Sequence, residues 1–289
     1  MKVIAVDVGG TNIRVALIES SDDTILHRTS CSIDKVGGKK VVEQIIHLIN
    51  PLIKDVKGIG VAVAGAVTSD GLVWAPNIAG WKDLPLAKIL KEKFQVDVVV
   101  KDDRSSMAVG ESRFGIAKGY KNMAYVIVGT GIAAGLLIDG KVYEGSRGVA
   151  GSIGWLITDG KITQNPTHGN FESKVSGLAL EKKFGMNGQM LAEMASKGDE
   201  KALDNLNKLG EEIGIGIANL VTIVDPEIVV IGGGVSKSWK YIEKGIRHTL
   251  NEWGHPILKD IKVVCSSLGD DAGILGVYDV IKERVGDQG

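Results

Sequence analysis

The sequence has few of the features that mark secreted, membrane-bound or nucleic-acid-binding proteins. Its 289 residues include only two cysteines, Cys31 and Cys265, which cannot form a disulfide framework or a four-cysteine metal site. No apolar run approaches the roughly 20 residues of a membrane span, and the chain does not open like a signal peptide. The formal net charge of −1, with no basic tail, argues against electrostatic binding of nucleic acid. We therefore expect a cytoplasmic protein that binds neither membrane nor nucleic acid.

Proline is scarce and glycine is abundant, with 6 and 39 residues respectively. Because glycine is costly inside helices and strands, this excess indicates that some glycines serve a specific purpose. They cluster at residues 9–10, 129–135, 145–154 and 232–234, mostly beside apolar β-branched runs.

The apolar pattern predicts an α/β protein whose two halves share one plan. Strands are expected at 2–8, 12–19, 24–30, 58–65, 96–101, 123–128, 133–138, 227–231 and 261–264, and helices at 39–54, 104–114, 202–223, 236–251 and 272–285. Each half opens with a strand, a glycine turn and a second strand. This repetition favours a duplicated α/β fold with a cleft between two lobes.

The first glycine turn joins a carboxylate to two polar side chains. Asp7 lies near the end of the first expected strand, Gly9 and Gly10 turn the chain, and Thr11 and Asn12 follow. Glycine exposes backbone N–H groups and lets a phosphate approach closely, and Asp7 could hold Mg²⁺ through water. An ordinary polar hairpin turn explains the same residues equally well.

Two further glycine segments lie in the second half. Gly129, Thr130 and Gly131 again separate two expected strands, where they could cradle the other side of a polyphosphate. The run Gly232-Gly233-Gly234 follows a strand and offers a flat backbone surface for a purine. No segment matches the Walker A pattern, and neither glycine turn is a strand-to-helix dinucleotide motif. A plain glycine hairpin remains the alternative for the turn at 129–131, and a plain loop into the next helix for 232–234.

Adjacent carboxylates, Asp102 and Asp103, follow the strand expected at 96–101. Ligands of α/β folds bind at the carboxyl ends of strands, and a carboxylate there can accept a proton from a substrate hydroxyl. Since a helix is expected directly afterwards, capping of that helix by Asp103 or its neighbour is the simpler interpretation.

Taken together and in order, these segments resemble the ROK family of repressors, open reading frames and sugar kinases. The resemblance runs from Val3 to about Gly276 and comprises DVGGTNIR at 7–14, APN and GW within 75–81, DD and GE within 102–111, GTGIAAG at 129–135, DPEIVVIGGG at 225–234 and DAGILG at 271–276. It implies a two-lobed, duplicated ribonuclease-H-like fold of the actin/hexokinase superfamily with an interlobe cleft. Residues 1–103 would form the first lobe, with the C-terminal helix 272–289 packed back on it, and 104–271 the second.

The resemblance also implies an activity, the phosphorylation of a sugar hydroxyl with ATP and Mg²⁺. The first candidate is the 6-hydroxyl of a hexose, as in glucokinases and hexokinases, with Asp103 as general base. ATP is expected at Asp7, Gly9, Gly10, Thr11, Asn12, Gly129, Thr130, Gly131, Gly233 and Gly234, with Asp7 holding Mg²⁺ through water. The sugar is expected at Asn77, Asp102, Asp103, Ser152, Trp155 and Glu172.

The sequence departs from the family pattern around the sugar. The usual GEIGH segment is GSIGW at 151–155, and Asp102 replaces the usual Asn before the base. A sugar-binding glutamate and a zinc-binding histidine are thereby lost. The other three zinc ligands, all cysteines, are replaced by Thr163, Asn165 and Asn170, and His168 alone cannot make a zinc site. We therefore expect no zinc site, and an indole at Trp155 that stacks on the sugar.

These departures leave the acceptor open. A kinase for an N-acetylhexosamine, fructose, a sugar acid or a polyol is the main alternative to a hexose kinase. A non-catalytic sugar-binding or regulatory protein would be favoured if Asp103 were lost. A transcriptional repressor is disfavoured. It would need a helix-turn-helix before the first strand, which is expected to begin at Lys2, and a basic DNA-binding element, which the sequence lacks. We expect a homodimer.

Overall fold

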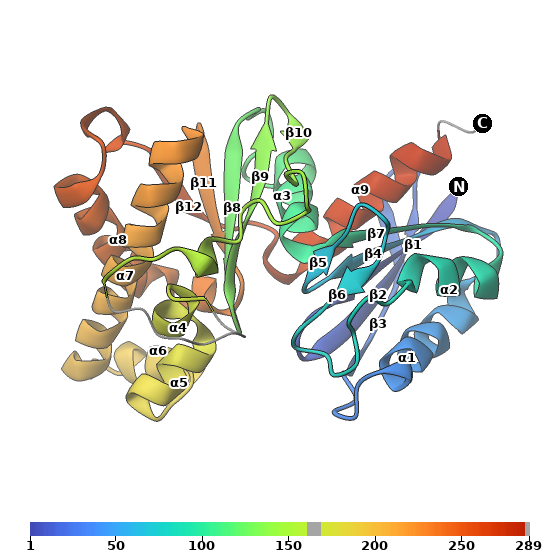
Figure 1. Ribbon diagram of the computed structural model, residues 1–289, viewed down its shortest axis with the longest axis horizontal. Coiled ribbons are helices and arrows are strands. Elements are labelled where there is room, and N and C mark those ends of the chain that lie inside the picture. The colour runs from blue at the N-terminus through green and yellow to red at the C-terminus, as the bar shows by residue number, and fades with distance from the viewer. Residues whose placement is uncertain (161–168, 287–289) are drawn as a thin grey trace. The chain divides into compact units, whose positions relative to one another are not determined.

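The computed structural model describes residues 1–160 and 169–286, which divide into two α/β units. Unit 1 comprises Met1–Gly119, Val142–Ala150 and the C-terminal residues from Asp270. Unit 2 comprises Tyr120–Lys141 and Gly151–Gly269. Each unit contains its own five-stranded sheet (Figure 1).

The sheet of unit 1 has the strand order β3-β2-β1-β4-β7. Its strands are β1 (Lys2–Val8), β2 (Asn12–Glu19), β3 (Thr24–Ser32), β4 (Val56–Val63) and β7 (Asp97–Asp102). The first three are antiparallel, whereas β1, β4 and β7 are parallel. The unit also contains the small hairpin β5 (Ala66–Val67) and β6 (Val73–Trp74), and the helices α1 (Lys39–Ile49), α2 (Leu86–Phe94), α3 (Asp103–Phe114) and α9 (Ala272–Gly286).

Both faces of this sheet are apolar, because helices cover both. Successive side chains of a strand point to opposite faces, so Ile4 and Val6 join the core that includes residues of α1 and α2, while Val3 and Ala5 join the core formed with α9. Helix α9 lies so close to β4 that a Cβ at Gly60 would come within 2.6 Å of the Val277 carbonyl oxygen.

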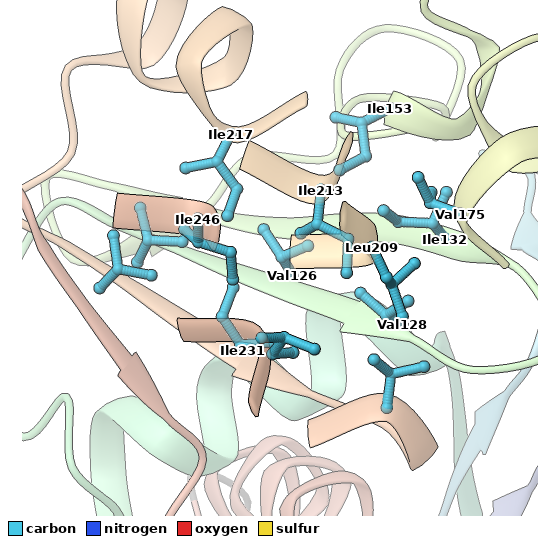
Figure 2. Packing of buried hydrophobic residues seen from close by; sticks show 14 of the residues in the cluster. Val126, Val128, Ile132, Ile153, Val175, Leu209, Ile213, Ile217, Ile231 and Ile246 are labelled. Atoms are coloured by element: carbon cyan, nitrogen blue, oxygen red, sulfur yellow. The ribbon is translucent and has the colours of Figure 1, made fainter. Parts of the chain in front are cut away.

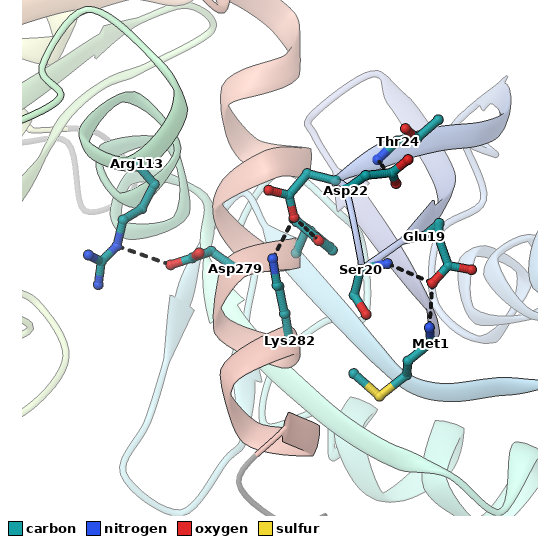
Figure 3. Close-up of polar contacts among 10 residues, drawn as sticks. Met1, Glu19, Ser20, Asp22, Thr24, Arg113, Asp279 and Lys282 are labelled. Carbon is teal, nitrogen blue, oxygen red and sulfur yellow. Dashed lines mark hydrogen bonds and ion pairs between the residues drawn. The ribbon is translucent and has the colours of Figure 1, made fainter.

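Polar contacts fasten α9 to its neighbours in unit 1. Lys282 and Tyr278 both bond to Asp23, in the turn between β2 and β3, and Arg113 of α3 bonds to Asp279 at 3.2 Å (Figure 3). Helices α3 and α9 also touch directly, since a Cβ at Gly110 would lie 2.2 Å from the carbonyl oxygen of Ala272. These contacts join α3 to unit 1, so the division differs from the expected boundary at residue 103.

The sheet of unit 2 has the strand order β10-β9-β8-β11-β12. Its strands are β8 (Met123–Val128), β9 (Ile132–Ile138), β10 (Lys141–Val142), β11 (Ile228–Gly232) and β12 (Lys262–Cys265); its helices are α4 (Glu172–Val175), α5 (Gly177–Phe184), α6 (Gly188–Ser196), α7 (Glu200–Val224) and α8 (Trp239–Trp253). Ile213 and Ile217 of α7 and Ile246 of α8 pack with Val126 and Ile231 in one apolar core (Figure 2). Short 3-10 turns are η1 (Asn50–Leu52), η2 (Ile153–Trp155), η3 (Gly234–Ser238), η4 (Pro256–Leu258) and η5 (Gly269–Asp271).

The two sheets repeat one arrangement, an antiparallel hairpin followed by two parallel strands. In unit 1 this is β2-β1-β4-β7, and in unit 2 it is β9-β8-β11-β12. The expected duplicated α/β fold is therefore confirmed. Every expected strand occurs with its ends within two residues of the prediction. Among residues 1–160 and 169–286, no helix has both the length and the hydrophobicity to span a bilayer.

Candidate active site

Three aspartates lie at one edge of the unit 1 sheet, where its parallel strands end. Strands β1, β4 and β7 are parallel, and their register pairs Asp7 with Ala62, and Val63 with Asp102. The carboxyl ends of these strands therefore coincide, and Asp103 follows directly as the first residue of α3. This edge is where α/β folds bind their ligands.

The carboxyl group of Asp103 has a strongly perturbed pKa. Burial and, to a smaller extent, the negative charges of Asp102 and Asp7 raise its pKa to about 7, against the lowering effect of Arg104. Its Oδ1 accepts only a local hydrogen bond of 2.8 Å from the backbone N–H of Arg104. A carboxyl group with a pKa near neutrality is well suited to act as a general base.

Asp102 is the residue that caps α3. Its Oδ1 accepts the backbone N–H of Ser105 at 3.0 Å and lies 3.2 Å from Nε of Arg104, and the residue is only 4% exposed. Asp102, and not Asp103, therefore caps the helix, which leaves the Asp103 carboxylate available for chemistry. Asp102 thus has a structural function, and its contact with sugar stays a prediction.

Asp7 has one bonded oxygen and one that has no partner in the described part of the chain. Arg14, its direct partner in the β1–β2 register, donates to Oδ2 at 3.0 Å, whereas the buried Oδ1 accepts no hydrogen bond. Burial raises the pKa of Asp7 to about 6, against the lowering effect of Arg14. A lone carboxylate oxygen of this kind fits a water molecule of hydrated Mg²⁺.

The first glycine turn connects β1 to β2 next to this carboxylate. The N–H of Gly9 closes the turn on the carbonyl oxygen of Asn12 at 3.0 Å, and Asn12 donates to the hydroxyl of Thr11 at 3.2 Å. Thr11 is exposed to solvent. The turn therefore presents a hydroxyl and an amide beside Asp7. Asn77, from the expected sugar site, lies exposed in a separate turn of unit 1.

In unit 2, Glu172 holds the second glycine turn. Its Oε2 accepts the backbone N–H of Ile132 at 3.1 Å, and a Cβ at Gly131 would lie only 2.4 Å from that oxygen. The carbonyl oxygen of Gly129 accepts the N–H of Gly177 at 2.7 Å. The segment around Glu172, which was expected at the sugar, thus also shapes the turn expected at the phosphates.

The third glycine segment lies against the same turn. Gly233 has φ +79°, and a Cβ there would lie 2.6 Å from the carbonyl oxygen of Val128, the last residue of β8. Gly234 has open space around it. Unit 2 therefore brings the residues expected at the adenosine and at the phosphates together.

The GSIGW segment is tied to β9. The carbonyl oxygen of Gly151 accepts the N–H of Ala134 at 2.7 Å, and Gly151 has φ +77°. Ser152 is half-buried, while the indole of Trp155 is 54% exposed and can stack on a ligand.

The replaced zinc ligands lie in or beside a segment that is only partly described. Thr163, Asn165 and His168 lie outside the described residues, and Asn170 is buried with Oδ1 accepting the N–H of Thr158 at 3.3 Å. Within residues 1–160 and 169–286, no group of three or more His, Cys, Asp and Glu could hold a metal. The absence of zinc stays a prediction.

Sequence reasoning did not identify Arg14, Lys101, Arg104 or Glu144 as parts of the site. Arg14 belongs to the DVGGTNIR segment, and strand alternation could have placed it beside Asp7. Glu144, which Lys101 contacts, and Gly148, which Arg104 contacts, lie more than 40 residues away in sequence. No local pattern identifies such contacts.

The repeated sheets and their glycine turns define an α/β fold of the actin–hexokinase class. The chain matches the profile of the ROK family over residues 3–284, and it therefore belongs to the ROK family.

Individual relatives agree with this membership. An uncharacterised protein of Clostridium perfringens is 31% identical, over 96% of this chain and 97% of its own. A glucokinase of Halalkalibacterium halodurans is 29% identical, over 97% of this chain and 95% of its own. The crystal structure of a ROK family glucokinase from Streptomyces griseus, in complex with glucose and AMPPNP, is 28% identical with a TM-score of 0.83, covering 97% of this chain and 99% of that one.

Proposed function

We propose that this protein is a sugar kinase that transfers the γ-phosphoryl group of ATP to a sugar hydroxyl, with the 6-hydroxyl of a hexose as the first candidate. The observation that carries the proposal is Asp103, a carboxyl group with a pKa of about 7 at the carboxyl edge of the parallel strands. Similarity to glucokinases, one of them a complex with glucose and an ATP analogue, supports the same activity.

In the proposed reaction, Asp103 accepts the proton of the acceptor hydroxyl. The hydroxyl oxygen forms a bond to the γ-phosphorus, the bond from that phosphorus to the β,γ-bridging oxygen breaks, and ADP leaves with the electron pair. Phosphoryl transfer of this kind depends mainly on positioning and on charge stabilisation. A base with a pKa near 7 is ionised in a large fraction of molecules at neutral pH, so it can accept this proton.

The residues that would bind ATP lie in both units. Bound Mg²⁺ would neutralise phosphate charge, and Asp7 would hold it through water, since its Oδ1 is free of other partners in the described part of the chain. We propose that Gly9, Gly10, Thr11 and Asn12 of unit 1 contact the phosphates. Gly129, Thr130 and Gly131 of unit 2 would do the same from their turn, and Gly233 and Gly234 would contact the adenosine.

The acceptor is proposed to contact Asn77, Asp102, Ser152, Trp155 and Glu172. The exposed indole of Trp155 offers a stacking surface for the apolar face of a sugar ring. Ser152 stands where the family pattern has a glutamate, so a carboxylate that would accept hydrogen bonds from sugar hydroxyl groups is missing. An N-acetylhexosamine, fructose, a sugar acid or a polyol is therefore the alternative acceptor.

A coupled assay of ADP release tests the proposal directly. The panel contains hexoses, N-acetylhexosamines, sugar acids and polyols, each with ATP and Mg²⁺, and ³¹P NMR of the product identifies the phosphorylated position. We expect turnover with a hexose to exceed that with the other classes. Sugar binding by calorimetry without ADP release from any acceptor would instead support a non-catalytic sugar-binding protein.

A further inference from the structure

Arg104 is a buried arginine whose guanidinium contacts a carboxylate and a backbone carbonyl group. Only 8% of the residue is exposed. Its Nε lies 3.2 Å from Oδ1 of Asp102, and its Nη2 donates a 2.8 Å hydrogen bond to the carbonyl oxygen of Gly148. Arginine is rarely buried unless it is paired, and these two contacts satisfy part of that requirement.

Gly148 belongs to a loop, residues 143–150, that is held from two places on unit 1. Lys101, on β7, bonds to Glu144 at 2.7 Å, and Arg104, on α3, bonds to Gly148. The loop packs tightly, because Gly148 has φ +70° and a Cβ there would lie 2.7 Å from the carbonyl oxygen of Val67. Lys101 and Arg104 therefore flank Asp102 and Asp103 in sequence and hold the same loop.

The chain continues from this loop directly into the GSIGW segment, which contains two of the residues proposed to contact the sugar, Ser152 and Trp155. On the other side, Arg104 follows Asp103 immediately. One guanidinium thus connects the residue pair that carries the general base to the loop that precedes the sugar-contacting segment.

We propose that Arg104 is a positioning residue that couples the Asp102–Asp103 pair to loop 143–150 and thereby sets the affinity for the acceptor. This inference rests on the proposed sugar kinase activity. The family pattern has a neutral Asn where this chain has Asp102. We infer that Arg104 compensates for the additional negative charge and uses the resulting ion pair to fix the loop.

The surrounding charges agree with this arrangement. Burial is the largest cause of the raised pKa of Asp103. The charges of Asp102 on β7 and Asp7 on β1 also raise this pKa, and Arg104 on α3 lowers it. The other nearby charges are paired among themselves: Arg14 of β2 contacts Asp7 and Asp270, and Lys101 contacts Glu144. Loss of Arg104 would leave Asp102 without this counter-charge, and the pKa of Asp103 would rise further.

Four variants separate the two effects of Arg104, on the loop and on the charge of Asp102. Arg104→Gln removes both the positive charge and the guanidinium group, whereas Arg104→Lys keeps the charge but not the guanidinium. Asp102→Asn removes the opposing negative charge. The double variant Asp102→Asn/Arg104→Gln leaves a neutral pair. Arg147→Gln is the matched control, because Arg147 lies exposed on the same loop and no bond of its side chain is described.

Two measurements on the protein without substrates do not depend on the activity. Amide hydrogen exchange reports the protection of residues 143–150, and a ¹³C NMR titration reports the pKa of Asp103. We expect Arg104→Gln to speed exchange of the loop about tenfold or more and to raise the pKa of Asp103 by about one unit. The double variant should restore the pKa but not the protection. Arg104→Lys should keep the pKa near that of the wild type.

Kinetics with the best acceptor complete the test. We expect Arg104→Gln to raise the KM for the acceptor about tenfold with little change in the KM for ATP, and the double variant to keep the high acceptor KM. Arg147→Gln should match the wild type throughout. Wild-type exchange, pKa and KM in a folded Arg104→Gln protein would overturn the inference. A wild-type protein that phosphorylates no acceptor would overturn the proposed function instead, while the exchange and the titration would still decide on Arg104.

Discussion

Among single residues, Asp103 gives the most direct test of the proposed chemistry. Asn preserves the shape of Asp but cannot accept a proton, so we expect Asp103→Asn to lower kcat by roughly 10²–10⁴-fold or more. In the wild type, kcat/KM should rise with pH through about 7, where Asp103 ionises. ADP release across a pH series measures both effects. Asp70→Asn, an exposed change in unit 1, is the control, and near-normal turnover of a folded Asp103→Asn variant would contradict the assignment.

The same carboxyl group should lower the stability of the protein at alkaline pH. The pKa of Asp103 is raised from 3.8 to about 7 in the folded state, so between these values the folded state binds a proton that the unfolded state does not. Stability therefore falls as pH rises from about 4 to 7. We expect Asp103→Asn to raise Tm at pH 8 and to change it less at pH 4, as measured by thermal unfolding. Equal shifts at both pH values would show that ionisation of Asp103 has no such cost.

The sequence predicts Asp103 as the base, which stays a prediction, and it did not show which of the two aspartates caps the helix. Asp102 and Asp103 both precede the expected helix, and the choice depends on side-chain directions that only the folded chain fixes. The contact of Arg104 with Gly148 depends on a loop 44 residues further along the chain. By contrast, the positions of Asp7 and of the first glycine turn followed directly from the sequence, because the apolar pattern shows strand β1 clearly; their contacts with ATP stay a prediction.

At the scale of elements, the second glycine turn offers a matched pair of substitutions. A Cβ at Gly131 would lie 2.4 Å from Oε2 of Glu172, whereas a Cβ at Gly129 would meet no atom within 4 Å. We expect Gly131→Ala to lower Tm by several degrees because it displaces the carboxylate that holds the turn, and Gly129→Ala to leave Tm nearly unchanged. Thermal unfolding compares them, and equal values would contradict the proposed function of Glu172 in shaping this turn.

The segment between η2 and α4 carries the prediction about zinc. Three of the family's four ligands would fall at Thr163, Asn165 and Asn170, which lack the thiolates that zinc prefers. Elemental analysis of protein purified without a metal-binding tag should find well under one zinc per chain. One zinc per chain that resists a chelator would show that this segment binds metal through other residues.

The long, regular elements followed directly from the sequence, and the short ones did not. Helix α7 was expected at 202–223 and occupies Glu200–Val224, because its apolar residues recur at helical spacing over many turns. Helices α2, α4, α5 and α6 went unpredicted. They contain only four to nine residues each, which is too short for a clear helical apolar pattern.

For the whole molecule, the proposed reaction requires residues of both units on the same substrates. Asp103 belongs to unit 1 and the second glycine turn to unit 2, so we expect the units to close around sugar and nucleotide and to exclude water. Solution scattering should show a smaller radius of gyration with sugar plus a non-hydrolysable ATP analogue than with either ligand alone. Unchanged scattering, with saturation shown by calorimetry, would contradict closure.

The packing of α9 has a consequence for the synthesis of the protein. One face of the unit 1 sheet, including Val3 and Ala5 of β1, packs against Val277 and Ile281 of α9, which is synthesised more than 260 residues later. Until α9 has been synthesised, this face has no cover and stays open to other apolar surfaces. Unit 1 can therefore complete its fold only after α9 has been made, whereas all of unit 2 has been synthesised before that point.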